Sequence, residues 1–290
     1  AAVVPAPASG SAPVPTHHTR HGERFEWRPI AVASGGGNAF SRVQIPIGDG
    51  VGAVEFDLVN TTDQAFLAQT GTIRSILTAS DLQTGVYEGG FKLWECSLDL
   101  VKYVELLLRD NQSPFRMPRK VMELGCGHGI PAIHALQRGA EQVAFMDYNK
   151  EVLELTTCPN VYRNVQGDTS VFAKASFYAG AWGSVSEYMQ NVEGQSWEQS
   201  QYDLILTAET IYTEAVTVEL YEMIKRHLRR DPASMALVAA KKYYFGTGGS
   251  VQHFLSLVQS EGIFRAEVVW EERDSRSNIR EIVRVVYASV

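Results

Sequence analysis

A glycine-rich segment in the middle of the chain combines residues that can bind a nucleoside. Glu123-Leu124-Gly125-Cys126-Gly127-His128-Gly129 follows a short apolar stretch and precedes a helical pattern. Glycines adopt positive φ and let backbone approach a ligand closely, and amides at a helix start bind anionic groups. Asp147 ends the next apolar stretch, 22 residues after Gly125, where a carboxylate can accept both hydroxyls of a ribose. The pattern predicts a nucleoside site walled by Gly125, Gly127 and Asp147.

The spacing of the glycines distinguishes two kinds of nucleoside ligand. A dinucleotide-binding loop has its third glycine one position later, where this chain has Ile130. The spacing G-x-G-x-G after an acid resembles the first motif of class I methyltransferases, whose cofactor carries a methionine ammonium that Glu123 can accept. A dinucleotide oxidoreductase and a turn without function remain alternatives. We expect His128 to fill the loop, because it has no visible partner, and Cys126 to be a small residue in a tight turn.

Alternating strand and helix patterns must position this loop. Strand patterns cover 121–124, 142–146, 171–178, 202–207, 235–240, 264–270 and 281–287, and helical patterns cover 93–109, 130–137, 151–156, 216–228 and 251–258. This alternation predicts an α/β fold, doubly wound, with a mostly parallel seven-stranded sheet covered on both faces. Right-handed crossovers bring the ends of parallel strands to one edge, where ligands bind.

Composition and charge restrict the classes of function. The 290 residues carry a net charge of −7, which argues against binding nucleic acid mainly by charge but permits a basic protein substrate. No apolar run reaches the length of a membrane span. Three sparse cysteines predict no disulfide framework and a reducing, intracellular compartment. His17, His18 and His21 lack suitably spaced partner ligands, so we expect no metal.

The chain divides at about residue 80. Residues 1–80 are predicted to be an N-terminal leader and arm, and residues 81–290 the main domain. The opening 1–15 is rich in Ala, Pro and Ser and lacks acids, which favours a flexible leader over a transit peptide. Residues 51–59 have the pattern of a short strand and 35–37 that of a loop. The sequence of the arm does not indicate a function for it.

Three further stretches carry a family resemblance. They are Gly85-Val86-Tyr87-Glu88-Gly89-Gly90-Phe91-Lys92-Leu93-Trp94-Glu95-Cys96, Thr207-Ala208-Glu209-Thr210-Ile211-Tyr212 and Ala240-Lys241-Lys242-Tyr243-Tyr244-Phe245-Gly246-Thr247-Gly248-Gly249. With the glycine loop and Met146-Asp147-Tyr148-Asn149, they resemble the histidine protein methyltransferase 1 family of seven-β-strand methyltransferases. The resemblance runs from about residue 81 to the C-terminus. The first stretch separates this family from related lysine methyltransferases better than the glycine loop does.

The resemblance implies a protein-histidine N-methyltransferase that uses S-adenosyl-L-methionine, releases S-adenosyl-L-homocysteine and modifies a large-subunit ribosomal protein. It implies a cytoplasmic and nuclear location, including the nucleolus, with no direct specific nucleic-acid or membrane binding; a monomer is the default. The cofactor contacts that it implies are Leu93, Trp94, Glu95, Cys96, Ser97, Glu123, Gly125, Gly127, Asp147, Tyr148, Asn149, Gly180, Ala181, Trp182 and Ala208. Ala208 stands where the family uses a small residue, which is serine in the human-type sequence, so a backbone contact is expected there and a side-chain hydroxyl contact is not.

Glu209 and Tyr212 follow the fourth strand and are candidates for the chemistry on the substrate. Free imidazole has a pKa near 6.5 and is largely neutral at pH 7, whereas lysine must first lose a proton. A histidine enzyme therefore needs control of the ring tautomer more than a strong base. Their spacing of three would place both side chains on one face of a helical turn. We predict that Glu209 orients the imidazole and accepts its proton, and that Tyr212 lines the slot.

Several alternatives remain open at this point. An acid followed by an aromatic residue also occurs in lysine-methylating relatives, so the pair predicts a substrate site rather than the substrate. A glutamate such as Glu209 is also typical of a helix start. Trp94 and Trp182 could instead be aromatic residues of the core. Lys241-Lys242 could be a solvated pair or could contact a partner. A protein-lysine methyltransferase, a cofactor-binding ribosome-assembly factor and a small-molecule methyltransferase with an enclosed pocket are the competing functions.

Overall fold

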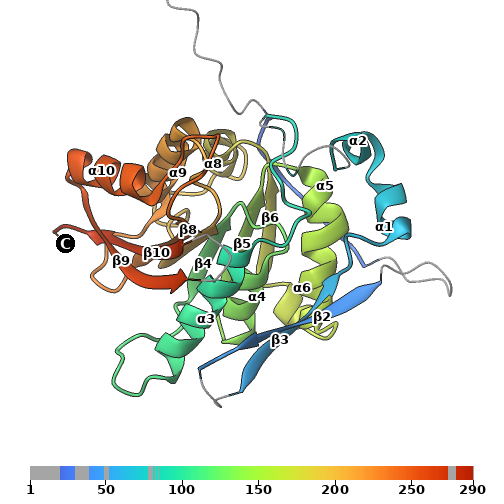
Figure 1. Cartoon of the computed structure of the whole chain (residues 1–290), viewed down its shortest axis with the longest axis horizontal. Helices are drawn as coiled ribbons and strands as arrows, with labels where there is room; N and C mark the ends of the chain where they lie inside the picture. Colours follow the sequence, from blue (N-terminus) through green and yellow to red (C-terminus); the bar gives the residue numbers. More distant parts are fainter. Residues whose placement is uncertain are drawn as a thin grey trace, which may run out of the picture.

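A large sheet forms the centre of the computed structural model, which describes residues 20–29, 39–48, 52–77, 81, 83, 85–273 and 279–289 (Figure 1). Its strands are β1 (Glu23–Arg24), β4 (Lys120–Leu124), β5 (Gln142–Asp147), β6 (Ala175–Ala179), β7 (Leu204–Ala208), β8 (Met235–Lys241), β9 (Phe264–Arg273) and β10 (Ile279–Tyr287). Their order is β1-β6-β5-β4-β7-β8-β10-β9, with β4 to β8 parallel and β1, β9 and β10 in antiparallel pairs. The predicted α/β fold class is confirmed, and β1 adds an eighth strand.

The helices cover both faces of this sheet. They are α1 (Gln64–Gln69), α2 (Arg74–Leu77), α3 (Glu95–Arg109), α4 (Ile130–Gln137), α5 (Lys150–Val152), α6 (Cys158–Asn164), α7 (Thr169–Phe172), α8 (Trp182–Asn191), α9 (Glu214–His227) and α10 (Val251–Glu261). One core lies against α3, α4 and α6, and another against α8, α9 and α10. Alternate residues of the central strands enter opposite cores, as Val121 and Met122 do, because strand side chains alternate in direction.

The strand order places a crevice above β4 and β7. From β4 the chain crosses to β5 and β6 on one side, whereas β7 and β8 lie on the other. The loops that leave β4 and β7 therefore diverge, and ligands bind at such a switch point. The glycine loop leaves β4 and the segment of Glu209 leaves β7, so the topology brings the two predicted halves of the site together.

The prediction of a strand over 171–178 is wrong in its first half. Asp168 accepts hydrogen bonds from the amides of Ser170 and Val171, and this cap begins the short helix α7. Val171 and Phe172 are therefore helical, and β6 begins only at Ala175. Trp182, one of the implied cofactor contacts, is the first residue of α8.

The helix predicted over 151–156 continues much further. A π-helical turn, Leu153–Thr157, joins α5 to α6, so helical structure extends to Asn164. Pro159 has no amide proton and its ring crowds the carbonyl four residues earlier, and a widened turn accommodates both effects. The turn carries Thr157, whose hydroxyl donates to the carbonyl of Gly127 at 2.6 Å and so supports the glycine loop.

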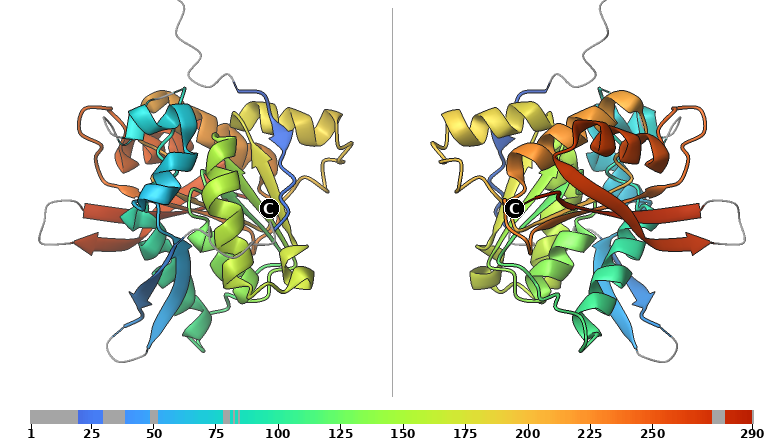
Figure 2. Two further views of the ribbon diagram at one scale, coloured as in Figure 1. Left: turned by 90° about the vertical axis from the view of Figure 1, so that its right-hand side faces the viewer. Right: turned by 90° about the vertical axis from the view of Figure 1, so that its left-hand side faces the viewer.

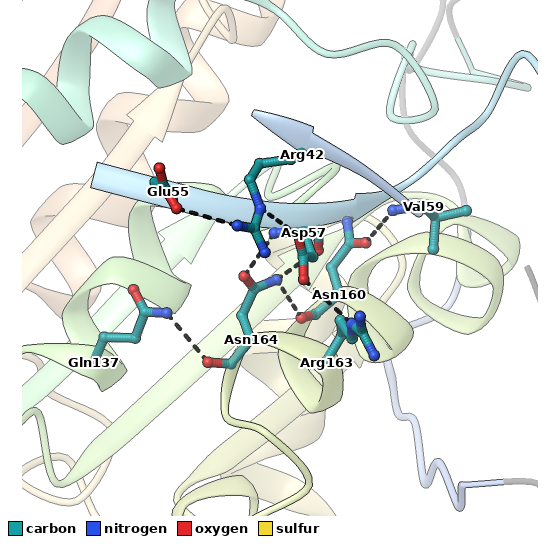
Figure 3. Close-up of polar contacts among 8 residues, drawn as sticks. All are labelled: Arg42, Glu55, Asp57, Val59, Gln137, Asn160, Arg163 and Asn164. Atoms are coloured by element: carbon teal, nitrogen blue, oxygen red, sulfur yellow. Dashed lines mark hydrogen bonds and ion pairs between the residues drawn. The ribbon is translucent and has the colours of Figure 1, made fainter. Parts of the chain in front are cut away.

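A separate hairpin, β2 (Phe40–Pro46) and β3 (Ala53–Val59), lies beside α6 and apart from the main sheet (Figure 2). Two asparagines of α6 satisfy the backbone of β3: the amide of Val59 donates to Asn160 at 2.7 Å, and that of Asp57 to Asn164 at 3.0 Å (Figure 3). Asn160 also donates to the carbonyl of His128 at 3.1 Å. The hairpin is therefore connected to the glycine loop through one buried side chain.

Asn160→Ala is expected to lower the free energy of unfolding by about 2–3 kcal/mol, because it leaves buried backbone groups of β3 and the glycine loop without partners. The side chain of Asn164 is only partly buried, so Asn164→Ala should lower the free energy of unfolding by only about 1 kcal/mol. Urea unfolding followed by tryptophan fluorescence measures both. Equal losses would show that the link to the glycine loop adds no stability.

The first 80 residues contribute to more than an arm. β1 belongs to that part of the sequence, yet it pairs with β6 at the edge of the main sheet. The division into 1–80 and 81–290 stays a prediction, and residues 1–15 and 35–37 lie outside the described residues. No helix in the described part of the chain is long and apolar enough to cross a membrane. Cys96, Cys126 and Cys158 are buried free thiols.

Candidate functional site

A crevice of about 780 Å³, including space open to solvent, lies at the carboxyl ends of the parallel strands. The predicted site residues that line it are Leu93, Trp94, Ser97, Glu123, Gly125, Gly127, Asp147, Tyr148, Gly180, Ala181, Trp182, Ala208, Glu209 and Tyr212. Residues from β4, β5, β7 and the start of α8 thus meet where the topology opens the sheet.

Three predicted cofactor contacts lie outside this lining. Glu95 begins α3 and its carboxylate is 3.5 Å from the guanidinium of Arg280. Cys96 is completely buried. Asn149 is also fully buried, and its side chain accepts from the amide of Glu88 at 3.0 Å and donates to the carbonyl of Val86 at 2.8 Å. These three residues support the walls of the crevice rather than facing it.

Sequence reasoning missed several lining residues. Glu88, Gly89, Gly90, Lys92 and Thr210 belong to stretches that carried the family resemblance, but none was assigned a role at the site. The glycine pair after an acid was the available signal, since glycines mark close approaches. A Cβ on Gly90 would lie 2.8 Å from Val152 and 3.1 Å from a carboxylate oxygen of Asp147. Only glycine allows this segment to pack against the end of β5.

The glycine loop has the conformation that its sequence predicts. Gly125, Gly127 and Gly129 all have positive φ, between 49° and 74°. A Cβ on Gly125 would lie 2.7 Å from the γ-methyl carbon of Thr210. The loop therefore presents bare backbone to the crevice, as the approach of a ligand requires.

The two acids of the nucleoside motif line the crevice and are deeply buried. Asp147 accepts hydrogen bonds from the amides of Gly127 at 2.9 Å and Asn149 at 3.0 Å. Burial raises the pKa of Asp147 to about 6, although these hydrogen bonds favour its charged form. Glu123 accepts from the amide of Ala132 at 3.0 Å, and burial raises its pKa well above the usual value. Both carboxylates would gain from donors that a bound ligand supplies.

His128 lines the crevice, but its ring is tied to the protein. Its Nε2 lies 3.0 Å from the carbonyl of Phe91, and its Nδ1 lies 3.4 Å from the amide nitrogen of Asn160. Burial lowers the pKa of His128 to about 4, so the ring is neutral at pH 7. These contacts support the predicted filling role. Cys126 is likewise buried, within 3.8 Å of the hydroxyl of Thr157.

Glu209 follows β7 directly and has an unusual backbone conformation. Its φ is +59°, in the left-handed region that non-glycine residues rarely adopt, at a cost of about 1–3 kcal/mol. The residues 209–212 form no helical turn, so the premise of the predicted shared face is wrong; α9 begins only at Glu214. Both Glu209 and Tyr212 nevertheless line the crevice. Such strain at a crevice is typical of functional sites.

The two oxygens of the Glu209 carboxylate differ in their hydrogen bonds. Oε2 accepts from the hydroxyl of Tyr244 at 2.8 Å. Oε1 is buried and accepts no hydrogen bond from an N–H or O–H group of the described residues, although the Cys96 thiol lies close to this carboxylate. A buried acceptor without a donor costs about 1–3 kcal/mol. The arrangement leaves Oε1 suited to a donor that a ligand brings.

Tyr212 pairs with a second acid of the crevice wall. Its hydroxyl donates to Glu88, which also accepts from the amide of Gly85 at 2.5 Å. Burial and the neighbouring charge of Glu88 raise the pKa of Tyr212, so its hydroxyl stays protonated at neutral pH. The pair joins the segment after β7 to the segment before α3.

The aromatic residues of the motif occupy defined places at the crevice. The indole nitrogen of Trp94 donates to the carbonyl of Gly89 at 3.0 Å, and the amines of Lys92 and Lys241 lie 4.5 and 5.4 Å from the centre of its ring. Lys242 instead lies 3.2 Å from Glu281. Trp94 is therefore an aromatic residue of the crevice rim.

Two other aromatic residues of the lining are held by neighbouring segments. Tyr148 donates to the carbonyl of Gly85 at 2.9 Å, and the guanidinium of Arg20 lies 5.3 Å from the centre of its ring. Trp182 both lines the crevice and belongs to a hydrophobic core, so a cofactor contact and a core role are compatible for this residue.

The residues present fit a cofactor that carries positive charge. Glu88, Glu123, Asp147 and Glu209 line one crevice, and their carboxylates suit a sulfonium and an ammonium group. Gly125 and Gly127 line the crevice without side chains, so their backbone is open to contact with a ligand. Among the described residues, no group of His, Cys, Asp and Glu side chains could hold a metal ion. His17 and His18 lie outside the described residues, so the expected absence of a metal stays a prediction.

Comparison with known proteins places the chain in a family. Residues 76–261 match a family model described as lysine methyltransferase. A histidine protein methyltransferase 1 homolog of Dictyostelium discoideum is 37% identical over 210 residues, covering 72% of this chain and 62% of that protein. A homolog of the same name from Bos taurus is 33% identical over 241 residues, covering 76% and 62%. The chain thus spans 62% of the length of these two relatives.

Solved structures also resemble this chain. An O-methyltransferase from Bacillus cereus in complex with S-adenosylhomocysteine is 13% identical, with a TM-score of 0.46, and the match covers 68% of this chain and 83% of that one. The family match agrees with the predicted methyl donor. The relatives confirm the predicted resemblance to histidine protein methyltransferase 1. Because the family model matches well over half of the chain, the chain belongs to the lysine methyltransferase family.

Proposed function

We propose that this chain transfers a methyl group from S-adenosylmethionine to a ring nitrogen of a histidine in a target protein. Relatives named histidine protein methyltransferase 1 support this activity. The observation that carries it is the carboxylate of Glu209, which lines the crevice with Oε2 bonded to Tyr244 and a buried Oε1 that lacks an N–H or O–H donor among the described residues. The N–H of a neutral imidazole is such a donor.

Different residues of the crevice would bind the cofactor and the substrate imidazole. Gly125 and Gly127 would hold the methionine part by their backbone, with Glu123 accepting its ammonium, and Asp147 would accept the ribose hydroxyls. When bound, S-adenosylmethionine supplies an electrophilic methyl group. Glu209 would hold one imidazole nitrogen as N–H, which leaves the lone pair of the other nitrogen free, and would then take the proton that the methylated ring releases.

The modified residue decides between histidine and its nearest alternative. The family model is described as lysine methyltransferase, and a lysine must lose a proton before it can attack. Incubation of the protein with isotope-labelled S-adenosylmethionine and recombinant large-subunit ribosomal proteins made in bacteria, followed by mass spectrometry of digests, identifies the residue. Label on histidine supports the proposal, and label confined to lysine overturns it.

The target and the location belong to the same proposal. We propose a large-subunit ribosomal protein as substrate, because the resemblance implies it and a chain of net charge −7 suits a basic partner. Such a substrate would be met in the cytoplasm or in the nucleus, including the nucleolus, without binding to nucleic acid or membrane. The labelling experiment tests the substrate, and imaging of a tagged chain tests the location.

Cofactor affinity is expected to depend on the charge of Asp147. The pKa of about 6 in the free protein means that this group gains a proton as the pH falls, whereas ribose hydroxyls donate to its charged form. The dissociation constant of S-adenosylhomocysteine should therefore rise about tenfold between pH 7.5 and pH 5. Isothermal titration calorimetry across this range measures the change.

Asp147→Asn is the matched control for this pH dependence, because it cannot titrate. It should bind more weakly at pH 7.5 and show a nearly flat profile. Folding raises the pKa of Asp147, so protonation of this carboxylate stabilises the folded state as the pH falls through 6. A loss of cofactor affinity at low pH is therefore not explained by unfolding of the protein through protonation of Asp147. An unchanged profile in Asp147→Asn would assign the dependence to another group.

A further inference from the structure

Tyr244 lies beside Glu209 although 35 residues separate them in the sequence. Its hydroxyl donates to Glu209 Oε2 at 2.8 Å and accepts from the amide of Lys241 at 3.2 Å. The single hydroxyl proton is therefore directed at the carboxylate. Burial and the charge of Glu209 raise the pKa of Tyr244 well above its usual value, so the hydroxyl remains a donor.

The backbone around Tyr244 is bonded to the loop that carries Glu209. The amide of Tyr244 donates to the carbonyl of Gly249 at 2.9 Å, and the amide of Gly249 donates to the carbonyl of Tyr212 at 3.1 Å. A Cβ on Gly249 would lie 2.0 Å from the carbonyl oxygen of Ile211. Only glycine permits this approach, so the position of Tyr244 is fixed relative to Glu209.

We propose that Tyr244 is a positioning residue that holds the Glu209 carboxylate so that only Oε1 is left to receive the substrate imidazole. This inference rests on the proposed histidine methylation. With Oε2 occupied, one oxygen in one orientation selects the ring nitrogen that carries the proton. Tyr244 would thereby determine which nitrogen receives the methyl group, without itself touching the substrate.

Tyr244→Phe tests the proposal, because it removes the hydroxyl and keeps the ring. Loss of one hydrogen bond to a charged group should lower kcat about 10- to 30-fold, with KM for the recombinant large-subunit ribosomal proteins and affinity for S-adenosylhomocysteine changed less than about threefold. The product should change from one methylhistidine isomer to a mixture, measured by chromatography of acid hydrolysates. Tyr243→Phe is the matched control, since Tyr243 is 53% exposed, and it should behave as the wild type.

A double-mutant cycle with Glu209→Gln distinguishes a route through Glu209 from a direct one. If Tyr244 acts through this carboxylate, Tyr244→Phe should lower kcat less than about twofold in the Glu209→Gln background. A full additional loss would show that it acts independently. Turnover and a single isomer like those of the wild type in Tyr244→Phe would overturn the inference while leaving the proposed function intact.

Binding of 4-methylimidazole, which reproduces the histidine side chain, provides a test that needs no protein substrate. NMR titration of protein saturated with S-adenosylhomocysteine should show about 5- to 10-fold weaker binding in both Glu209→Gln and Tyr244→Phe than in the wild type. Equal binding in Tyr244→Phe and the wild type contradicts the positioning role. Failure of the wild type to bind 4-methylimidazole contradicts the proposed function as well.

Discussion

Glu209→Gln is expected to lower kcat about 100- to 1,000-fold while changing the dissociation constant of S-adenosylhomocysteine less than about threefold. Glutamine keeps the size of the side chain and an oxygen acceptor, but it cannot take the proton that the methylated imidazole releases. The cofactor is expected to contact the glycine loop and Asp147, which the substitution leaves in place. Initial rates with labelled S-adenosylmethionine and calorimetry with S-adenosylhomocysteine measure the two quantities separately.

The control for this variant is Glu214→Gln. Glu214 is an exposed acid at the start of α9, five residues away, and it does not line the crevice. Its substitution should leave kcat within about twofold of the wild type. A parallel loss of turnover and cofactor affinity in Glu209→Gln would indicate that Glu209 only shapes the crevice, and the proposed proton transfer would then be wrong.

The sequence predicted those features that local patterns determine. The central strands could be located because apolar side chains occupy both of their faces, as Val121 and Met122 do on β4. The glycine loop could be located because its positive φ angles require glycine. Errors arose where one polar residue or one proline changes local structure: Asp168 caps a helical turn inside the predicted third strand, and Pro159 accompanies a π-turn that continues the helix.

The missed parts of the site depend on contacts between distant segments. Nothing local to Tyr244 indicates that its hydroxyl bonds to Glu209, because the bond exists only once β7 and β8 lie side by side. The positive φ of Glu209 is equally hidden, since a glutamate does not mark the left-handed region as glycine does. Glu88 is brought to Tyr212 across 124 residues. Sequence patterns thus identified which strands end at the site, whereas the partners of its acids required the fold.

Gly125→Ala is expected to weaken S-adenosylhomocysteine binding at least about 100-fold. The new Cβ would lie 2.7 Å from the γ-methyl carbon of Thr210. Thr210 cannot turn away without breaking the 2.6 Å hydrogen bond between its hydroxyl and that of Thr207. The glycine loop must therefore move toward the crevice, where it displaces the backbone that would contact the cofactor. Calorimetric titration measures the affinity, and urea unfolding measures the accompanying loss of stability.

Two further variants separate the steric clash from the backbone cost. Gly194→Ala has a matching φ of +64° but open space around the new Cβ, so it should lose about 1–2 kcal/mol of stability and no cofactor affinity. Adding Thr210→Ser to Gly125→Ala removes the clashing methyl group and keeps the hydroxyl, and it should recover about tenfold in affinity. If Gly125→Ala bound S-adenosylhomocysteine as tightly as the wild type, the glycine loop could not be the cofactor wall, and the assignment of the crevice would fail with it.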